Sequence, residues 1–245
     1  MSNSYFQFKQ FKIYQDHCAM KVTTDSCLFG AWVAGKAKSG KSATCSVLDI
    51  GTGTGLLSLM LAQKINTFID AIEIDKDSFE QAIENVKGSE WNEKITVHHI
   101  DAKEFAGDIL YDLIICNPPF YENELKSGNN QKNIAHHSDK LELSELLDII
   151  KNNLATDGIF CLLLPFKRNN EIKILLSENR LSITRITYVR QSKSHDYFRI
   201  MLIGKFTTDE ITDPVIDEIS IKDNTPEQSY TPAFTDLLKD YYLHL

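Results

Sequence analysis

The most constraining feature of this sequence is a glycine-rich turn between an apolar run and a helical pattern. Residues 47–50 read Val-Leu-Asp-Ile, then Gly51, Gly53 and Gly55 follow, and the helical pattern begins at Leu56. Glycine suits such a turn because it has no side chain to block a ligand and because it readily adopts positive φ. A strand, a glycine loop and a helix in succession indicate a nucleotide-binding α/β domain.

The spacing of the glycines discriminates between ligands. The dinucleotide fingerprint G-x-G-x-x-G would need its third glycine at Leu56, but the glycine stands one residue earlier, at Gly55. Asp49 also lies two residues before the first glycine. The resulting form, D-x-G-x-G-x-G, resembles motif I of class I methyltransferases, which use S-adenosylmethionine (SAM). A dinucleotide site and an ordinary strand–helix turn remain alternatives.

Strands and helices alternate along the first 205 residues. We expect strands at 46–50, 68–74, 95–100, 113–116, 159–164, 183–190 and 198–205. Helices are expected after the Thr-Thr-Asp-Ser cap at 23–26 up to Gly35, at 55–64, at 76–87, at about 139–154 with Ser138 or Asp139 as cap, and from 166 to about 179. This alternation predicts an α/β, Rossmann-like fold of the class I methyltransferase type. Its seven-stranded, mostly parallel sheet would have helices on both faces and a C-terminal antiparallel hairpin.

The charge distribution separates the body of the chain from its tail. The 245 residues carry a formal charge of −8, but nine acids and only two lysines follow Phe206, so the first 205 residues are nearly neutral. We expect a methyltransferase domain over 1–205, in which the arm and helix of 1–40 form part of the SAM and RNA site. Residues 206–245 would be an acidic extension packed on that domain, with a short helix near 233–243. A nearly neutral body still allows a local basic patch to meet RNA phosphates.

Several classes of protein are disfavoured by composition. No apolar run approaches the ~20 residues of a membrane span, and the first residues lack a signal-peptide pattern, so a cytoplasmic protein without membrane contact is expected. The five cysteines form no C-x-x-C pair and are expected to be reduced. Adjacent histidines at 98–99 and 136–137 have poor chelate geometry, so no metal is expected.

Acidic residues end two of the expected strands. Glu73 lies 22 residues after Gly51, a spacing that suits a carboxylate bound to both ribose hydroxyls. Asp75 is better explained as the N-cap of the next helix. Asp101 could accept from an adenine amino group while the backbone N–H of Ala102 serves a ring nitrogen, although an N-cap is a rival explanation for Asp101.

The fourth expected strand ends in the most specific signal of the chain, Asn117-Pro118-Pro119-Phe120-Tyr121. Two prolines stop the strand and fix φ, and Pro118 keeps Asn117 out of helical geometry. The Asn117 side-chain oxygen and a rigid backbone carbonyl can then face one planar amino group, while an aromatic residue stacks on the ring that bears it. An Asn-Pro turn with incidental aromatic residues is the alternative.

These residues resemble a known family. The tetrapeptide at 117–120 matches the (N/D/S)-P-P-(Y/F) signature of methyltransferases that act on adenine, guanine or glutamine amino groups. The segments at 8–11 and 15–32 resemble the opening of bacterial tRNA1(Val) adenine-N6 methyltransferases, and the similarity continues to the tail. The resemblance implies SAM-dependent N6-methylation of the adenine 3′ of the anticodon, with the anticodon stem-loop of tRNA as partner and no obligatory protein partner.

The resemblance also implies roles for particular residues. Lys21, Thr24 and Asp25 would lie near the methionine end of SAM, although helix capping also explains Thr24 and Asp25. The family usually carries arginine where His17 stands and glycine where Thr23 and Ser26 stand.

RNA contact is expected at two places. The long polar loop after the proline pair carries Lys126 and Lys132, and with Phe120 and Tyr121 it would bind the substrate, unless it is only a surface loop. The first twenty residues mix aromatic and basic side chains, which suits nucleic-acid contact, but an arm packed on the domain is the commoner explanation for such a segment.

Three rival functions stay open at this point. Glutamine-N5 methylation of peptide release factors uses the same tetrapeptide, but that family usually carries an additional helical domain. Guanine-N2 methylation of ribosomal RNA is a second rival. A SAM-fold RNA-binding protein without activity is the third, and the presence of Asp49, Glu73 and the 117–120 tetrapeptide argues against it.

Overall fold

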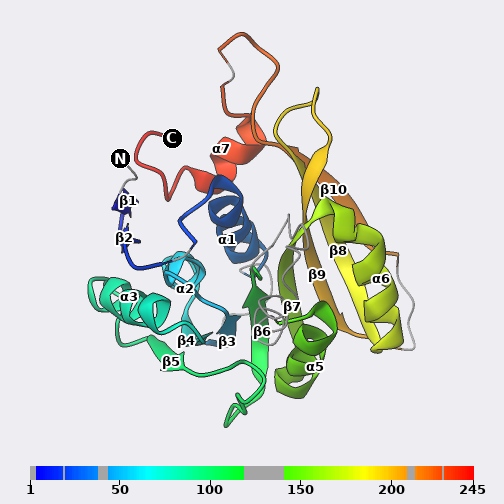
Figure 1. The fold of residues 1–245 in the computed structure, drawn as a ribbon. Helices are drawn as coiled ribbons and strands as arrows, with labels where there is room; N and C mark the ends of the chain where they lie inside the picture. The colour runs from blue at the N-terminus through cyan, green and yellow to red at the C-terminus, as the bar shows by residue number, and fades with distance from the viewer. Residues whose placement is uncertain (1–3, 19, 38–43, 119–140, 209–212, 228) are drawn as a thin grey trace, which may run out of the picture.

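The fold is built on an eight-stranded sheet with the strand order β10-β8-β9-β7-β6-β3-β4-β5 (Figure 1). The computed structural model describes residues 4–18, 20–37, 44–118, 141–208, 213–227 and 229–245. The strands are β3 (Cys45–Ile50), β4 (Thr67–Glu73), β5 (Ile95–His99), β6 (Tyr111–Cys116), β7 (Leu154–Pro165), β8 (Leu181–Arg190), β9 (Tyr197–Phe206) and β10 (Val215–Ser220). Only β9 of this sheet runs antiparallel to its neighbours, β7 and β8; the other pairs are parallel.

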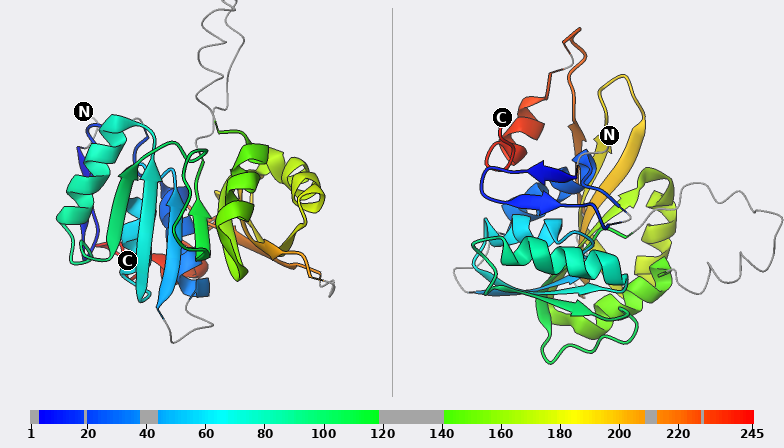
Figure 2. Two further views of the ribbon diagram at one scale, coloured as in Figure 1. Left: turned by 90° about the horizontal axis from the view of Figure 1, so that it is seen from below. Right: turned by 60° about the vertical axis from the view of Figure 1, so that its left-hand side comes forward.

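Helices cover both faces of the sheet. Residues of α1 (Thr24–Ala37), α2 (Leu56–Ala62), α3 (Lys76–Lys87) and α7 (Pro232–Leu238) belong to one buried cluster. Those of α5 (Leu143–Asn153) and α6 (Asn169–Glu178), which follows the 3₁₀ turn η1 (Phe166–Arg168), belong to the other. Figure 2 shows the sheet between these two layers.

The central strands are apolar on both sides because both of their faces are buried. In β6, Leu113 and Ile115 join the cluster under α1 and α2, whereas Ile114 and Cys116 join the cluster under α5. Alternation along a strand sends successive side chains to opposite faces, so a doubly covered strand reads as a continuous apolar run.

The expected class of fold is confirmed, and the structure adds one strand to the main sheet and a separate two-stranded hairpin, β1 (Tyr5–Gln7) and β2 (Lys12–Tyr14). All seven predicted strands are present, and β8 and β9 form the predicted antiparallel hairpin. The eighth strand, β10, pairs in parallel with β8 and was missed, because its mostly exposed segment mixes Val and Ile with acidic residues.

Several predicted element ends were wrong by a few residues. The helix α1 continues through Gly35 to Ala37, and β7 begins at Leu154, where the preceding helix was expected to end. The helix α5 is capped at Glu142 by a reciprocal pair of hydrogen bonds with Glu145, whereas the predicted caps, Ser138 and Asp139, lie outside the described residues.

The two ends of the chain meet beside α1. The strands β1 (Tyr5–Gln7) and β2 (Lys12–Tyr14) form a small antiparallel hairpin. Phe8 bridges to Tyr242, and the Lys9 backbone N–H donates to the Tyr241 carbonyl at 2.8 Å. The right-hand view of Figure 2 shows this hairpin in front of α7. The N-terminal segment is therefore part of the packed domain.

The described ranges hold neither a helix long and apolar enough to cross a membrane nor a group of three or more His, Cys, Asp and Glu residues suited to a metal ion. All five cysteines are free thiols, and four of them are buried.

Candidate active site

A cavity of about 540 Å³ lies at the carboxyl ends of the central strands. It sits where the strand order reverses: β3 is followed along the chain by β4 on one side, while β6 lies on its other side. Such switch points hold the ligand in open α/β sheets. The cavity brings together eight of the predicted site residues, namely Lys21, Gly51, Gly53, Glu73, Asp101, Ala102, Asn117 and Pro118.

The glycine loop forms one wall of the cavity in a backbone conformation that favours glycine. Gly51, Gly53 and Gly55 have φ values of 70°, 56° and 79°. A Cβ atom added to Gly51 or Gly53 would meet no heavy atom within 4 Å, so in the described structure these positions need glycine for its backbone conformation rather than for tight packing. Gly51 and Thr52 both donate their N–H groups to the Ile72 carbonyl, at 2.9 and 3.1 Å, which ties the loop to β4.

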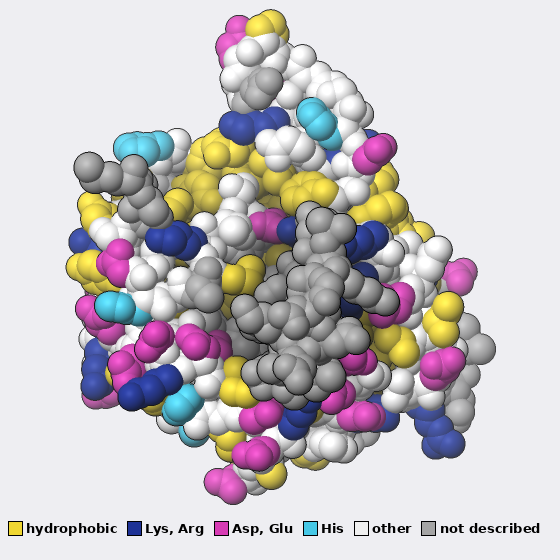
Figure 3. All heavy atoms as spheres, viewed as in Figure 1, with side chains coloured by type: hydrophobic (Ala, Val, Ile, Leu, Met, Phe, Trp, Pro, Cys, Tyr) yellow, Lys and Arg dark blue, Asp and Glu magenta, His cyan; other side chains and the backbone are white. Residues whose placement is uncertain are grey.

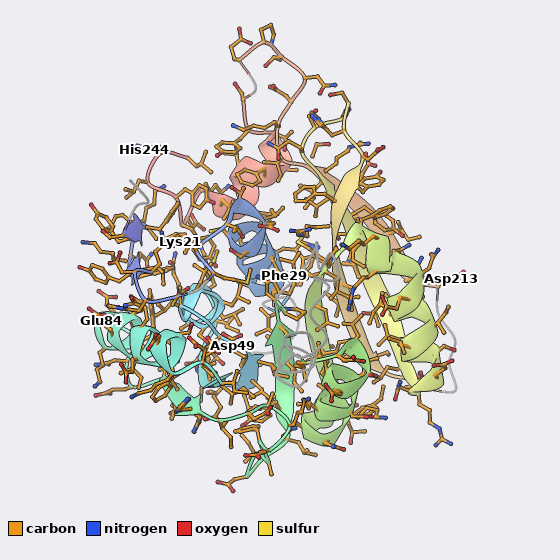
Figure 4. All side chains as sticks on the ribbon, viewed as in Figure 1. Lys21, Phe29, Asp49, Glu84, Asp213 and His244 are labelled. Atoms are coloured by element: carbon orange, nitrogen blue, oxygen red, sulfur yellow. The ribbon has the colours of Figure 1, made fainter. Side chains whose placement is uncertain are left out.

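Asp49 lies beneath this loop and does not line the cavity. Its side chain is fully buried, and Oδ2 accepts hydrogen bonds from the Thr52 and Ser58 hydroxyls, both at 2.7 Å. Burial raises the pKa of the Asp49 carboxyl to about 6, although the two hydroxyl bonds oppose this shift; the nearby Glu73 charge adds to it. The predicted cofactor residue Asp49 therefore acts in this structure on the shape of the loop (Figure 4).

Glu73, at the end of β4, is hydrogen-bonded directly to the glycine loop. Its Oε2 accepts from the Gly53 N–H at 2.8 Å, and its Oε1 accepts from the Asp75 N–H at 2.9 Å. An ionised carboxylate has about four acceptor sites, so these two bonds orient the group and leave capacity for ligand hydroxyls. The side chain is only 9% exposed, which strengthens any hydrogen bond that it accepts from a ligand.

Asp101 and Ala102 line the cavity beyond β5. Asp101 Oδ1 accepts from the Lys103 N–H at 2.9 Å, so part of this carboxylate shapes a turn and not the start of a helix. Asp75 is the N-cap of α3, as predicted, because its Oδ2 accepts from the Ser78 N–H at 2.9 Å.

Asn117 and Pro118 follow β6 and form the wall next to the glycine loop. Asn117 is half-buried and Pro118 is buried. The Asn117 Oδ1 atom is buried, and no described residue donates a hydrogen bond to it. A buried acceptor without a donor costs free energy, so an atom of this kind at a cavity wall is suited to accept a hydrogen bond from a ligand N–H group.

The segment before α1 and the first turn of that helix form another side of the cavity. Lys21 (Figure 4) lines it, with Thr23 and Ser26, whose hydroxyl groups hydrogen-bond to each other at 3.0 Å. Thr24 and Asp25, predicted beside Lys21, are outside the cavity wall. Asp25 Oδ2 instead accepts from Arg199 Nε of β9 at 2.8 Å, which ties the first turn of α1 to the sheet.

Four predicted substrate residues lie outside the described ranges: Phe120, Tyr121, Lys126 and Lys132. Gly55 is described but does not line the cavity. A Cβ atom added to it would lie 3.8 Å from Ala82 of α3.

The cavity also has lining residues that the sequence analysis missed. Among them is Ile74, an apolar side chain that is 53% exposed between the acids Glu73 and Asp75. An apolar residue between two acids at a strand end was the available signal, because an exposed apolar side chain there can contact a ring. Others include Met20, Val22, Thr23, Ser26, Ser78, Lys103 and Leu141.

The arrangement suits a nucleoside-bearing ligand. A ribose would lie against the Glu73 carboxylate, a base between Ile74 and Asp101, and a more polar end against the glycine loop and Lys21. Asn117 lines the same space from the carboxyl end of β6, where a second, amino-bearing molecule would meet the first.

Sequence comparison finds relatives that match the whole length of the chain. Residues 37–156 match the family model described as methyltransferase small domain. The chain is 36% identical over 245 residues to a tRNA1(Val) (adenine(37)-N6)-methyltransferase of Phocaeicola vulgatus, covering 100% of both chains. It is 39% identical over 249 residues to the protein of the same name from Cytophaga hutchinsonii, again covering 100% of both.

Comparison with solved structures supports the fold. A predicted O-methyltransferase from Agrobacterium tumefaciens superposes with a TM-score of 0.67 at 15% identity, covering 88% of this chain and 96% of that one. A putative RNA methyltransferase from Pyrococcus horikoshii gives a TM-score of 0.56 at 18% identity, covering 79% and 88%. At these identities the similarity concerns the fold alone.

Proposed function

Because the chain belongs to the tRNA1(Val) (adenine(37)-N6)-methyltransferase family, we propose that it methylates N6 of an adenine in tRNA with SAM as methyl donor. The adenine is position 37, beside the anticodon of valine tRNA. The partner is then the anticodon stem-loop.

The observation that carries this proposal is the buried Asn117 oxygen at the cavity wall, to which no described residue donates. An adenine N6 amino group has two N–H bonds to donate, and Asn117 Oδ1 would accept one of them. A backbone carbonyl of the proline corner would accept the other. Pro118 restricts the backbone of Asn117 to extended geometry, which keeps the two acceptors in place without a ligand.

Two aimed acceptors address the difficulty of the reaction. The lone pair of an exocyclic adenine nitrogen is delocalised into the ring, so the nitrogen is a poor nucleophile. Acceptors that hold both N–H bonds favour a more tetrahedral nitrogen and stabilise the positive charge that develops on it. Bound SAM would supply a sulfonium methyl group that needs no further activation. Holding the amine in line for attack would supply much of the remaining rate enhancement.

Glu73 would bind the ribose of the cofactor, and Asp101 and Ala102 would bind its adenine. The backbone of Gly51 and Gly53 would lie against the cofactor. Lys21 would lie toward its carboxylate. Asp49, Gly55, Thr24 and Asp25 would act on these residues from behind the wall, since they do not line the cavity.

The RNA must present its adenine outside the base stack. Unstacking costs less in a single-stranded loop than in a duplex, which fits an anticodon loop as the target. We assign Phe120 and Tyr121 to stacking on the target base, and Lys126 and Lys132 to the loop phosphates.

The test is an assay of purified protein with labelled SAM against total tRNA, ribosomal RNA and peptide release factors. Labelling of tRNA alone, with the modified nucleotide mapped to adenine 37 by mass spectrometry, is the expected result. Labelling of ribosomal RNA or a release factor in place of tRNA would contradict the proposal.

The role of Asn117 is tested with Asn117→Ala. We expect methyl transfer to fall by about 100-fold or more, because an aimed partner of the developing charge is lost. Calorimetry should give the same affinity for SAM as in the wild type. Asn92→Ala, which removes an exposed amide elsewhere, is the control and should leave both quantities unchanged. Loss of SAM binding in Asn117→Ala would refute the assigned role.

A further inference from the structure

Three aromatic rings meet beside the candidate active site, and the proposed reaction does not use them. Phe166 follows β7, Tyr188 lies near the end of β8, and Tyr197 begins β9. Their ring centroids are 5.6 Å (Phe166 to Tyr188), 5.5 Å (Phe166 to Tyr197) and 5.3 Å (Tyr188 to Tyr197) apart. Each is half-buried, so part of every ring faces solvent. We refer to Phe166, Tyr188 and Tyr197 as the aromatic cluster.

Charged and polar contacts from β8 and β10 hold the aromatic cluster in place. The Arg190 guanidinium lies 5.2 Å from the Tyr197 ring centroid. It also donates from Nη2 to Glu218 at 2.6 Å and from Nε to Ser220 at 2.9 Å. The Tyr197 hydroxyl donates to the same Glu218 carboxylate. Ordered rings lose little conformational freedom when a partner stacks on them, so such a surface is prepared for binding.

The aromatic cluster lies on the same edge of the sheet as Asn117. β6 and β7 pair in parallel, with Cys116 opposite Leu162, so Pro165 and Phe166 extend past the same edge as Asn117. Pro165 in turn pairs with Arg199 of β9, two residues from Tyr197. The three rings therefore lie one to three strands away from β6, the strand that ends at Asn117, along the same edge of the sheet.

Basic side chains flank the aromatic cluster. Lys167 follows Phe166 directly, Lys193 lies in the turn between β8 and β9, and both are exposed. Within the described residues neither forms a salt bridge. In Figure 3, Lys and Arg side chains and hydrophobic side chains, a class that includes tyrosine, lie near one another above and to the right of the undescribed residues.

Aromatic rings with nearby cations are typical of protein surfaces that bind unpaired nucleotides. Bases stack on Tyr and Phe rings whatever their identity, and Lys side chains meet the phosphates between them. A loop that gives up one base to a methyltransferase leaves its neighbours without a stacking partner on that side. A surface within a few strands of the reaction centre can receive one of them.

We propose that the aromatic cluster stacks on an unpaired base of the substrate RNA next to the target adenine, with Lys167 and Lys193 on the adjoining phosphates. This assignment rests on the proposed function, since it names a second contact for the same substrate. It also accounts for β10, whose Glu218 and Ser220 support Arg190 and Tyr197.

The variants Tyr197→Ala and Tyr197→Phe test the proposal in the full-length protein with tRNA. We expect Tyr197→Ala to raise the KM for tRNA by about tenfold, the effect of losing one base–ring stack. Its kcat and its affinity for SAM should stay within about twofold of the wild type. Tyr197→Phe keeps the ring, so its KM for tRNA should stay near that of the wild type. If Tyr197 acted only through the hydrogen bond of its hydroxyl, Tyr197→Phe would raise the KM as Tyr197→Ala does. Circular dichroism checks that both variants fold.

The matched control is Phe68→Ala. Phe68 is a 63% exposed aromatic residue at the start of β4, at the end of that strand away from the candidate active site. Its replacement should leave the KM for tRNA unchanged. An unchanged KM in Tyr197→Ala, or an equal rise in Phe68→Ala, would overturn the proposal.

A binding measurement separates this inference from the proposed function. An anticodon stem-loop with 2-aminopurine beside the target adenine should lose fluorescence on binding to the wild type, and recover it with Tyr197→Ala. Absence of tRNA methylation by the wild type would overturn the proposed function, while the fluorescence still decides whether the aromatic cluster binds RNA. Normal methylation, together with the same fluorescence change in the wild type and in Tyr197→Ala, would overturn the proposed role of the aromatic cluster and leave the proposed function standing.

Discussion

At the scale of single residues, Asp49 shows how one carboxylate can act on a site that it does not touch. It is fully buried under the glycine loop, with both hydroxyl donors on Oδ2 and no described donor to Oδ1. An ionised group in such a position is held at a cost, because its lost hydration is only partly replaced. This cost follows from the geometry of the glycine loop, and it should lower the free energy of unfolding when Asp49 is ionised.

The stability of the protein should therefore depend on pH through Asp49. The pKa of this carboxyl is about 6 in the folded state, above its ordinary value of 3.8. The folded state thus binds this proton more tightly than the unfolded state, and the contribution of Asp49 to stability falls as pH rises from about 4 to about 6. We expect Asp49→Asn, which cannot ionise, to gain about 1 kcal/mol relative to the wild type between about pH 5 and about pH 7.5.

Urea unfolding at the two pH values, without ligand, measures this difference. The exposed Asp157→Asn is the control for a general charge effect. A difference between Asp49→Asn and the wild type that does not change with pH would show that Asp49 is ionised at no cost.

At the scale of elements, the loop between β3 and α2 is determined by backbone conformation. Three glycines with positive φ reverse the chain within five residues, and Glu73 accepts from the middle one. The loop is anchored on β4, the next strand, so its shape depends on the sheet as well as on its own residues.

Alanine substitutions separate the two roles that glycine plays in these elements. Gly53→Ala should destabilise the protein by about 1–2 kcal/mol, because φ is 56° there, and should weaken SAM binding, because the new methyl group enters the cavity. Gly35→Ala, in the exposed last turn of α1 with no atom within 4 Å, should stabilise it by about 0.5–1 kcal/mol. Thermal unfolding and calorimetry measure both effects; equal shifts in the two variants would contradict this explanation of the loop.

At the scale of the whole molecule, the acidic tail is part of the core and of the sheet. Phe234 and Leu238 of α7 are fully buried, and Tyr241 donates its hydroxyl proton to the Met60 carbonyl of α2 at 2.9 Å. The tail thereby packs on the helices that support the glycine loop, while its charged side chains remain at the surface.

Removal of one tail side chain should destabilise the entire domain. Phe234→Ala should lower the free energy of unfolding by about 3–5 kcal/mol, since it leaves a cavity under α1 and a Tyr230 ring without its stacking partner. Leu243→Ala, at a 47% exposed position, is the matched control and should change it by less than about 0.5 kcal/mol. Denaturant unfolding of both variants is the measurement, and comparable values for the two would indicate that the tail is not integral to the fold.

The sequence alone determined those features that depend on local chemistry. Apolar runs ending in acids, the glycine spacing and the proline pair predicted the seven strands, the order of elements and the residues at strand ends, because each follows from backbone geometry within a few residues. Glu73, Asp101 and Asn117 meet at one cavity because parallel strands end at the same edge of a sheet.

Only the tertiary structure decided what depends on contacts between distant segments. Nothing near Asp25 in the chain announces its ion pair with Arg199, and nothing near Asp49 shows that the loop covers it. The eighth strand was hidden in an acidic segment, because pairing with β8 and support of Arg190 come from residues far away in the sequence. Side chains that lie together at one sheet edge through pairing of strands have no common signature along the chain, and the aromatic cluster is of that kind.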